Sequence, residues 1–165
     1  MNKNVYKKDR IRTVVLYVCG AVAVLSCVAL IAFFIFTLHL RTEYRACCLE
    51  INDRILASYA QEDRTIRMGN ESCPMDGAVQ DYYDRILLDA KTIVYNRRSF
   101  EPDDKCLILE FSGCRLIFRD LREGHWIGLR WETPEGTRCY SVASGDYTFM
   151  QMTAFFQNTL RRTGG

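Results

Sequence analysis

A long apolar run near the N-terminus limits what this chain can fold into. From Thr13 to Leu38 there are 26 residues without a formally charged side chain. A helix of that length is about 39 Å long, which exceeds the ~30 Å hydrocarbon core of a bilayer. The run is too long for the apolar core of a signal peptide, and residues 39–43 show no small-x-small cleavage pattern. We therefore expect residues 13–38 to stay in the protein as a transmembrane helix.

The charges on the two sides of this run differ in sign. Residues 1–12 carry five basic side chains and one acidic side chain, and residues 41–165 carry 17 basic and 19 acidic side chains. Cationic flanks are retained on the cytosolic side of a membrane. The pattern therefore predicts a single-pass type II protein of the secretory pathway, with a cytosolic N-terminus and the rest of the chain on the far side. The part of the chain after the apolar run has no stripe of basic side chains, so the sequence does not indicate a nucleic-acid partner.

Eight cysteines divide into three groups. Cys19 and Cys27 lie within the apolar run, where they act as small hydrophobic side chains. Adjacent Cys47 and Cys48 cannot easily bond to each other, so we predict an interchain disulfide and a covalent homodimer, with palmitoylation or an intradomain bridge as alternatives. The remaining four are predicted to form intradomain disulfides whose pairing is open: Cys73, Cys106, Cys114 and Cys139. No Cys-x-x-Cys spacing supports a zinc site.

One tripeptide is an acceptor for N-glycosylation. Asn70-Glu71-Ser72 has no proline at its middle position, and it falls on the side predicted to face the lumen or the exterior. We expect Asn70 to carry a glycan.

The pattern predicts five segments along the chain. These are a basic cytosolic tail (1–12), the transmembrane helix (13–38), a helical stalk (39–72), an ectodomain (73–160) and a disordered end (161–165). The stalk is inferred from Tyr44, Cys48, Ile51 and Ile55, whose spacing of four, three and four is that of a short heptad seam.

Within the ectodomain the hydrophobic spacing predicts an α+β fold with a mixed or antiparallel sheet. Apolar residues recur at three and four from Val79 to Val94, which predicts one amphipathic helix. Strands are predicted at residues 106–111, 126–131, 137–143 and 147–153, whereas residues 114–121 suit either a helix or a strand.

The order of these elements resembles that of a C-type lectin-like domain on a type II anchor. The residues that carry the resemblance are the Cys73-Pro74 opening, the aliphatic strand 107–109, and Trp126-Ile127-Gly128-Leu129, which is similar to the central strand of that family. The calcium-site triplets of the family are not matched, because Glu101-Pro102-Asp103 precedes the tryptophan strand instead of following it. Calcium-dependent carbohydrate binding is therefore not expected, and no cofactor or metal is implied.

Among such proteins, the short chain, basic tail and juxtamembrane cysteines most resemble the poxvirus glycoproteins of the extracellular enveloped virion. This resemblance implies display on a virion envelope or cell surface, and action in wrapping, release or cell-to-cell spread through a protein ligand or a companion envelope glycoprotein. One alternative is an immune-receptor-like protein or decoy ligand of the natural-killer-receptor group. Another is a membrane organiser acting through its span and stalk, where Cys19, Ala23 and Cys27 form a stripe of small residues.

No catalytic motif indicates an enzyme. His125 is interpreted as a structural histidine beside Trp126, and Asp103-Asp104 as a solvated turn. A binding role is favoured instead because a small domain cannot bury all its aromatic side chains, and exposed ones anchor protein interfaces. The candidates for contact with a partner are Trp131, Tyr147 and Phe149.

Overall fold

A computed structural model describes residues 3–60, 64–122 and 126–163. The chain divides into two compact units, one ending at His39 and the other beginning at Leu40.

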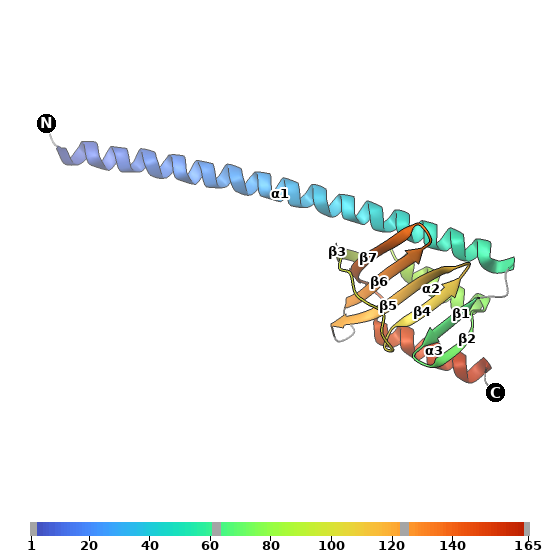
Figure 1. The fold of residues 1–165 in the computed structure, drawn as a ribbon. Coiled ribbons are helices and arrows are strands. Elements are labelled where there is room, and N and C mark those ends of the chain that lie inside the picture. The colour runs from blue at the N-terminus through green and yellow to red at the C-terminus, as the bar shows by residue number, and fades with distance from the viewer. Residues whose placement is uncertain (1–2, 61–63, 123–125, 164–165) are drawn as a thin grey trace. The chain divides into compact units, whose positions relative to one another are not determined.

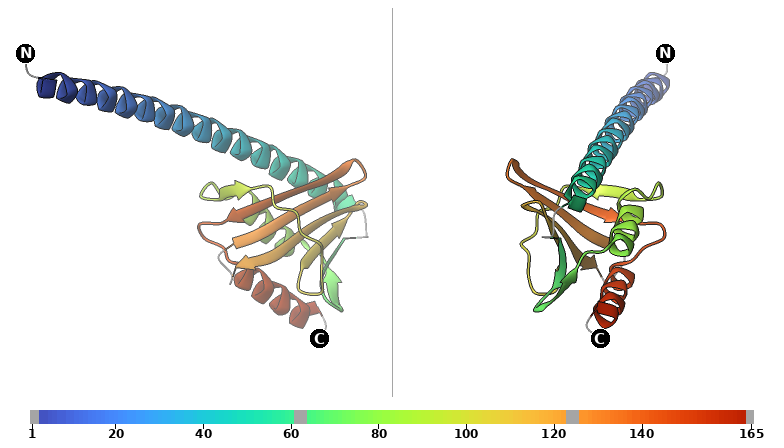
Figure 2. Two further views of the ribbon diagram at one scale, coloured as in Figure 1. Left: turned by 60° about the vertical axis from the view of Figure 1, so that its left-hand side comes forward. Right: turned by 90° about the vertical axis from the view of Figure 1, so that its right-hand side faces the viewer.

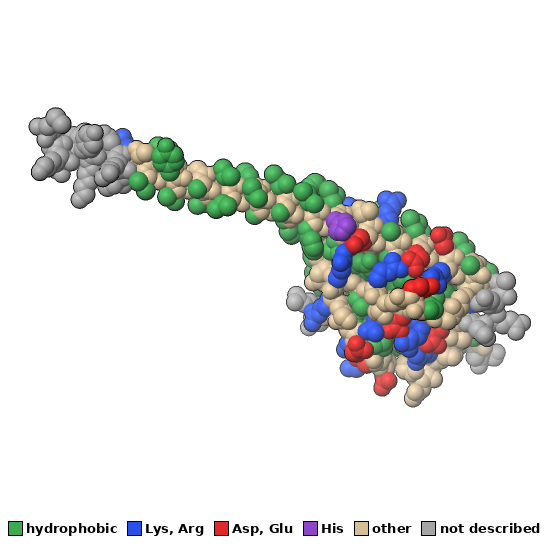
Figure 3. All heavy atoms as spheres, turned by 45° about the horizontal axis from the view of Figure 1, so that its top comes forward, with side chains coloured by type: hydrophobic (Ala, Val, Ile, Leu, Met, Phe, Trp, Pro, Cys, Tyr) green, Lys and Arg blue, Asp and Glu red, His purple; other side chains and the backbone are tan. Residues whose placement is uncertain are grey.

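The first unit contains the apolar part of helix α1, which as a whole runs over Lys3–Ala57. Its side chains from Arg12 onward are almost all exposed, and Figure 3 shows hydrophobic side chains along its length. A window of 18 residues in this helix reaches a mean hydropathy of 2.8 with none of it buried. By length and composition, the helix could cross a membrane.

The second unit is built on one antiparallel sheet of seven strands, in the order β2-β1-β4-β5-β6-β7-β3 (Figure 1). The strands are β1 (Thr65–Met68), β2 (Glu71–Pro74), β3 (Ile93–Asn96), β4 (Leu107–Phe111), β5 (Cys114–Arg122), β6 (Trp126–Thr133) and β7 (Gly136–Ala143). Strands β4 to β7 form a meander in which neighbours in sequence are neighbours in the sheet. The predicted α+β class and the antiparallel pairing are confirmed.

The helices cover one face of this sheet. They are α2 (Gly77–Leu87), α3 (Phe149–Thr163) and the part of α1 from Leu40 onward, which a single 3-10 turn (Ser58–Ala60) follows. Phe118, Leu129 and Tyr140 stand in register across β5, β6 and β7, so their side chains share a face. On that face Tyr83 of α2 stacks on Phe118, and Tyr44 of α1 meets Tyr140 edge to face with ring centroids 5.3 Å apart. Figure 2 shows the two layers from the side.

On the opposite face of the sheet, the segment 97–105 crosses the strands (Figure 1). Phe100 of this segment packs on Gly128, where an added Cβ would lie 2.8 Å from the ring. A glycine is thus required in the middle of β6 for this close approach. Phe100 belongs to a second, small cluster of buried side chains with Cys106, Ile108 and Ile117.

The predicted stalk is instead part of the domain. Tyr44, Cys48, Ile51 and Ile55 are buried against the sheet of the same chain, and residues 65–74 form two strands of that sheet. A helix that lies on a sheet needs the same spacing of apolar residues as a helix that pairs with another helix. The heptad spacing was therefore identified correctly, but the helix packs on the sheet of its own domain and does not form a stalk.

Three further boundaries differ from the sequence prediction. The helix that begins near Val79 ends at Leu87, and Ile93 and Val94 lie in β3. The predicted strand 147–153 is wrong, because α3 begins at Phe149. The predicted disordered end is also wrong over residues 161–163, where α3 continues to Thr163. The strands predicted at 106–111, 126–131 and 137–143 are confirmed to within two residues, and the ambiguous segment 114–121 is strand β5.

Helix α3 has the spacing of an amphipathic helix, which also stands in the sequence. Its buried residues are Phe149, Met152, Phe156 and Thr159, three, four and three residues apart. This is the period of an amphipathic helix. The Thr148 hydroxyl caps the start of the helix, because it accepts a hydrogen bond from the backbone N–H of Gln151 at 3.3 Å.

Candidate functional site

Strand β7 has one side that is only partly paired. Its whole length pairs with β6 on one side, whereas on the other side β3 pairs only with Ser141–Ala143. Among the described residues, Gly136–Tyr140 therefore have no strand neighbour on that side. A strand edge of this kind presents a row of backbone N–H and C=O groups that can pair with another extended segment.

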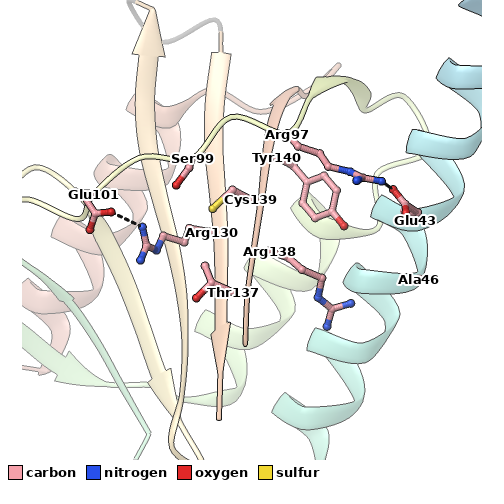
Figure 4. Close-up of a pocket in the computed structure, with 10 residues that line it drawn as sticks. All are labelled: Glu43, Ala46, Arg97, Ser99, Glu101, Arg130, Thr137, Arg138, Cys139 and Tyr140. Atoms are coloured by element: carbon pink, nitrogen blue, oxygen red, sulfur yellow. Dashed lines mark hydrogen bonds and ion pairs between the residues drawn. The ribbon is translucent and has the colours of Figure 1, made fainter. Parts of the chain in front are cut away.

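A groove of about 630 Å³ lies beside this open edge. Figure 4 shows its walls: α1 on one side, the segment 97–101 on another, and β6 and β7 between them. The lining residues are Glu43, Ala46, Arg97, Ser99, Glu101, Arg130, Thr137, Arg138, Cys139 and Tyr140.

Ion pairs hold the three arginines of the groove. Arg97 is paired with Glu43 of α1, which links the segment 97–101 to the helix. Arg130 contacts Glu132 at 2.6 Å and Glu101 at 3.3 Å. These pairs fix the positions of the guanidinium groups, and a guanidinium has five N–H donors, more than one carboxylate can accept.

The third arginine belongs to a cluster centred on Glu50 of α1. Arg138 is paired with this carboxylate, and Trp131 Nε1 donates a hydrogen bond to its Oε1 at 3.2 Å. Arg54, one helical turn away, lies 3.7 Å from the same oxygen. The hydrogen bond from Arg138 is the main cause that holds the pKa of Glu50 below its ordinary value. The cluster fastens α1 to the strands beside the groove.

The groove is lined mostly by polar and charged side chains. Its lining contains no histidine, and the described residues include no group of three or more histidine, cysteine, aspartate or glutamate side chains placed to hold a metal ion. Half-buried Cys139 lies opposite Arg130 across the β6–β7 register. The groove thus offers backbone groups, guanidinium groups, carboxylates and hydroxyls, which can bind a polar ligand.

The three aromatic residues predicted to contact a partner lie elsewhere. Trp131 is fully buried, and Phe149 is 7% exposed, so the prediction is wrong for these two side chains. Tyr147 is half-buried and meets Tyr82 edge to face at 5.9 Å. The indole N–H of Trp131 donates its hydrogen bond to Glu50, and this partner allows the tryptophan to be buried here.

The two adjacent cysteines predicted to link chains are in the core. Cys47 and Cys48 are 0% and 1% exposed, on the face of α1 that packs on the sheet. Burial is the main cause that raises the pKa of Cys47 to about 11 and that of Cys48 to about 12. A bridge between two chains through either sulfur would require α1 to leave the sheet, so this fold does not accommodate the predicted interchain disulfide.

The predicted intradomain disulfides are also not formed in this fold. Cys73, Cys106, Cys114 and Cys139 are all free thiols. They stand on β2, in the turn before β4, at the start of β5 and in the middle of β7. Cys106 instead donates a hydrogen bond to the Asp103 carboxylate at 3.3 Å.

Two further residues discussed in the sequence, Asn70 and Asp103, lie in turns or loops. Asn70 is exposed in the turn between β1 and β2, and its glycosylation stays a prediction. Asp103 forms an ion pair with Arg119 at 2.9 Å and accepts a hydrogen bond from the Lys105 backbone at 3.1 Å, as a turn residue does. His125 lies outside the described residues.

The residues that form the groove were not identified in the sequence. Arg97, Arg138 and Glu43 are spread over three elements, and the open edge depends on how far β3 extends. Only a short β3 leaves β7 partly unpaired, and strand ends are the least certain feature in a sequence.

Comparisons of the chain with protein-family models, with curated proteins and with solved structures found no match.

Proposed function

We propose that this chain is a membrane-anchored, non-catalytic binding protein that captures an extended peptide segment of a partner. The segment adds as a strand to the open edge of β7 in the groove beside α1. The observation that carries the proposal is that the groove of about 630 Å³ is lined by four of the five β7 residues, Thr137 to Tyr140, that lack a second strand neighbour within the described parts of the chain. Main-chain hydrogen bonds supply affinity in strand addition, and flanking pockets supply specificity.

The charges around the edge favour a segment with acidic side chains. Three arginines line the groove, and each keeps N–H donors beyond those that its paired carboxylates accept, which an acidic side chain of the added segment can use. Five residues of strand extend over about 17 Å at ~3.4 Å per residue, which is enough for several main-chain hydrogen bonds. Arg138 and Thr137 stand on opposite faces of β7, so both faces of an added strand would meet side chains.

The proposal includes anchoring by residues 13–38. The basic tail supports a cytosolic N-terminus, with the domain and Asn70 on the far side of the membrane. The resemblance to C-type lectin-like virion glycoproteins would make the partner a companion envelope glycoprotein. The tryptophan strand on which this resemblance depends is β6, which lies inside the sheet and borders the groove.

The test uses the full chain in nanodiscs and a phage library of random heptapeptides. Peptides that bind should be acidic, and amide hydrogen exchange should slow at Gly136–Tyr140 when they bind, because new main-chain hydrogen bonds form there. Protection that appears only elsewhere, or a library that yields no binder, would overturn the proposal.

A matched pair of variants makes the test specific for the groove. Ala46 is exposed and lines the groove, so Ala46→Trp should fill it and weaken peptide binding at least about tenfold, which is ~1.4 kcal/mol. Ala57 is an exposed residue at the end of the same helix, so Ala57→Trp should leave binding unchanged. Equal effects of the two variants would contradict the assignment of the groove.

A further inference from the structure

A second cavity lies close in sequence to the end of the apolar run. It measures about 280 Å³ and is formed between the first turns of α1 in the domain and the end of α2. Its lining includes Arg41, Arg45, Leu49, Leu88 and Thr92. The cavity therefore combines two cations with apolar side chains.

The two arginines have spare hydrogen-bonding capacity. Arg41 donates one hydrogen bond, to the Ala90 carbonyl at 3.1 Å, and Arg45 makes no hydrogen bond or ion pair within the described parts of the chain. Asp89 also lines the cavity, but its carboxylate accepts hydrogen bonds from the Lys91 backbone and the Ser144 hydroxyl, both at 2.9 Å. The local charge available to a ligand is therefore positive.

A buried hydroxyl of the same cavity lacks a partner. Thr92 is 6% exposed, and its Oγ1 has no hydrogen bond within the described residues. Leaving a buried hydroxyl unsatisfied costs about 1–3 kcal/mol, so such groups are normally paired with protein, water or ligand. Because Thr92 lines the cavity, this unpaired hydroxyl lies in or just behind the cavity wall, where a polar group could pair with it.

The position of the cavity along the chain indicates where that group comes from. Arg41 follows Leu38 by three residues, so it lies within about 11 Å of the end of the apolar run whatever the arrangement of the two units. The headgroup layer adds about 5–8 Å to each side of the hydrocarbon core. An arginine so near the end of a membrane-spanning helix reaches the phosphates of the lipid.

We propose that this cavity binds the phosphate of a membrane phospholipid through Arg41, Arg45 and Thr92. Exposed Leu49 and Leu88, at 48% and 44%, would contact the glycerol and the first carbons of the acyl chains. Guanidinium groups form charge-assisted hydrogen bonds to phosphate oxygens, and the Thr92 hydroxyl gains its missing partner. The inference rests on the anchoring of residues 13–38 that the proposed function includes.

Binding is measured on the full chain in neutral detergent by native mass spectrometry. The probes are dihexanoyl phosphatidylglycerol, dihexanoylglycerol without a phosphate, and inorganic phosphate. We expect the phospholipid to bind, and Arg45→Gln or the double variant with Arg41→Gln to weaken it at least about tenfold. Arg85→Gln, at an exposed residue of α2, is the matched control and should have no effect. Equal binding of the phosphate-free lipid, or equally tight binding of inorganic phosphate alone, overturns the proposal.

A second variant separates binding from folding. Thr92→Val removes the unpaired hydroxyl at nearly constant volume, so the lipid-free protein should be as stable as the wild type or more stable, while phospholipid binding weakens. Unchanged binding in this variant overturns the role of Thr92. Carbonate extraction tests the anchoring separately. If the wild type stays in membranes but binds no phospholipid, the lipid site alone is wrong. If it is extracted, the anchoring is wrong and the lipid site with it.

Discussion

Glu50 connects the helix to the sheet more than any other residue described above. Its carboxylate accepts from the indole of Trp131, pairs with Arg138 and lies near Arg54. The Trp131 ring is fully buried, and its N–H group loses the hydrogen-bond partner described above if the carboxylate is removed. The contribution of Glu50 to stability thus depends on the Trp131 N–H group that its removal would leave without a partner.

Glu50→Ala should lower the free energy of unfolding by about 1–3 kcal/mol, the cost of a buried unsatisfied donor. Chemical denaturation of the full chain in detergent measures the change. Asp53→Ala is the control, because Asp53 is exposed on the same helix, and it should change stability by less than about 0.5 kcal/mol. Equal losses in both variants would show that the cluster contributes no more than an ordinary surface residue.

The same carboxylate should make stability depend on pH at the acid end. The pKa of Glu50 in the folded protein lies below its ordinary value of 4.5, so its contribution is complete above about 4.5 and is lost as the pH falls through the folded pKa. Glu50→Gln removes this titration. Its stability curve between pH 5 and pH 3 should therefore be flatter than that of the wild type. Parallel curves would show that the pKa of Glu50 is the same in the folded and unfolded states.

At the scale of elements, α1 from Leu40 to Ala57 belongs to the core of the domain. Ile51 and Ile55 are fully buried, whereas Leu56 on the same helix is 49% exposed. The helix therefore distinguishes a sheet-facing side from a solvent-facing side.

Ile51→Ala should destabilise the domain by about 2–5 kcal/mol, because it removes buried methyl groups and leaves a cavity. Leu56→Ala deletes a similar apolar group at an exposed position and should cost less than about 1 kcal/mol. Thermal unfolding of both variants measures the difference. Similar losses in the two would indicate that residues 40–57 are a free stalk, as the sequence alone predicted.

The elements also show how far the sequence could predict the fold. The span, the antiparallel strands 106–111, 126–131 and 137–143, and the amphipathic start of α2 follow from local patterns that the structure repeats. The packing partner of the apolar residues from Tyr44 to Ile55 could not be predicted, because their spacing is the same in a helix that packs on a helix and in one that packs on a sheet. The groove was missed for the same reason: it depends on where β3 stops beside β7, which is a tertiary property.

At the scale of the whole molecule, the domain is held together by its core instead of by disulfides. All described cysteines are free, and the main hydrophobic cluster extends from Leu40 to Phe156. In this structure no disulfide contributes to the stability of the domain.

A reductant should leave the unfolding temperature of the full chain unchanged, whereas loss of a native disulfide typically costs about 2–5 kcal/mol. Calorimetry with and without reductant measures this. On a gel without reductant the chain should migrate as a monomer, because Cys47 and Cys48 are buried. A lower unfolding temperature under reduction, or a dimer band that reductant removes, would restore the disulfides predicted from the sequence.

The packing of α1 on the late strands also has a consequence for biosynthesis. Glu50 and Trp131 are 81 residues apart in the chain. At about 5–20 residues per second, the ribosome needs between about 4 and 16 s to make the second after the first. During this delay the sheet-facing side of α1, with Tyr44 and Ile51 among others, has no cover, so a chaperone that shields it should raise the yield of native protein.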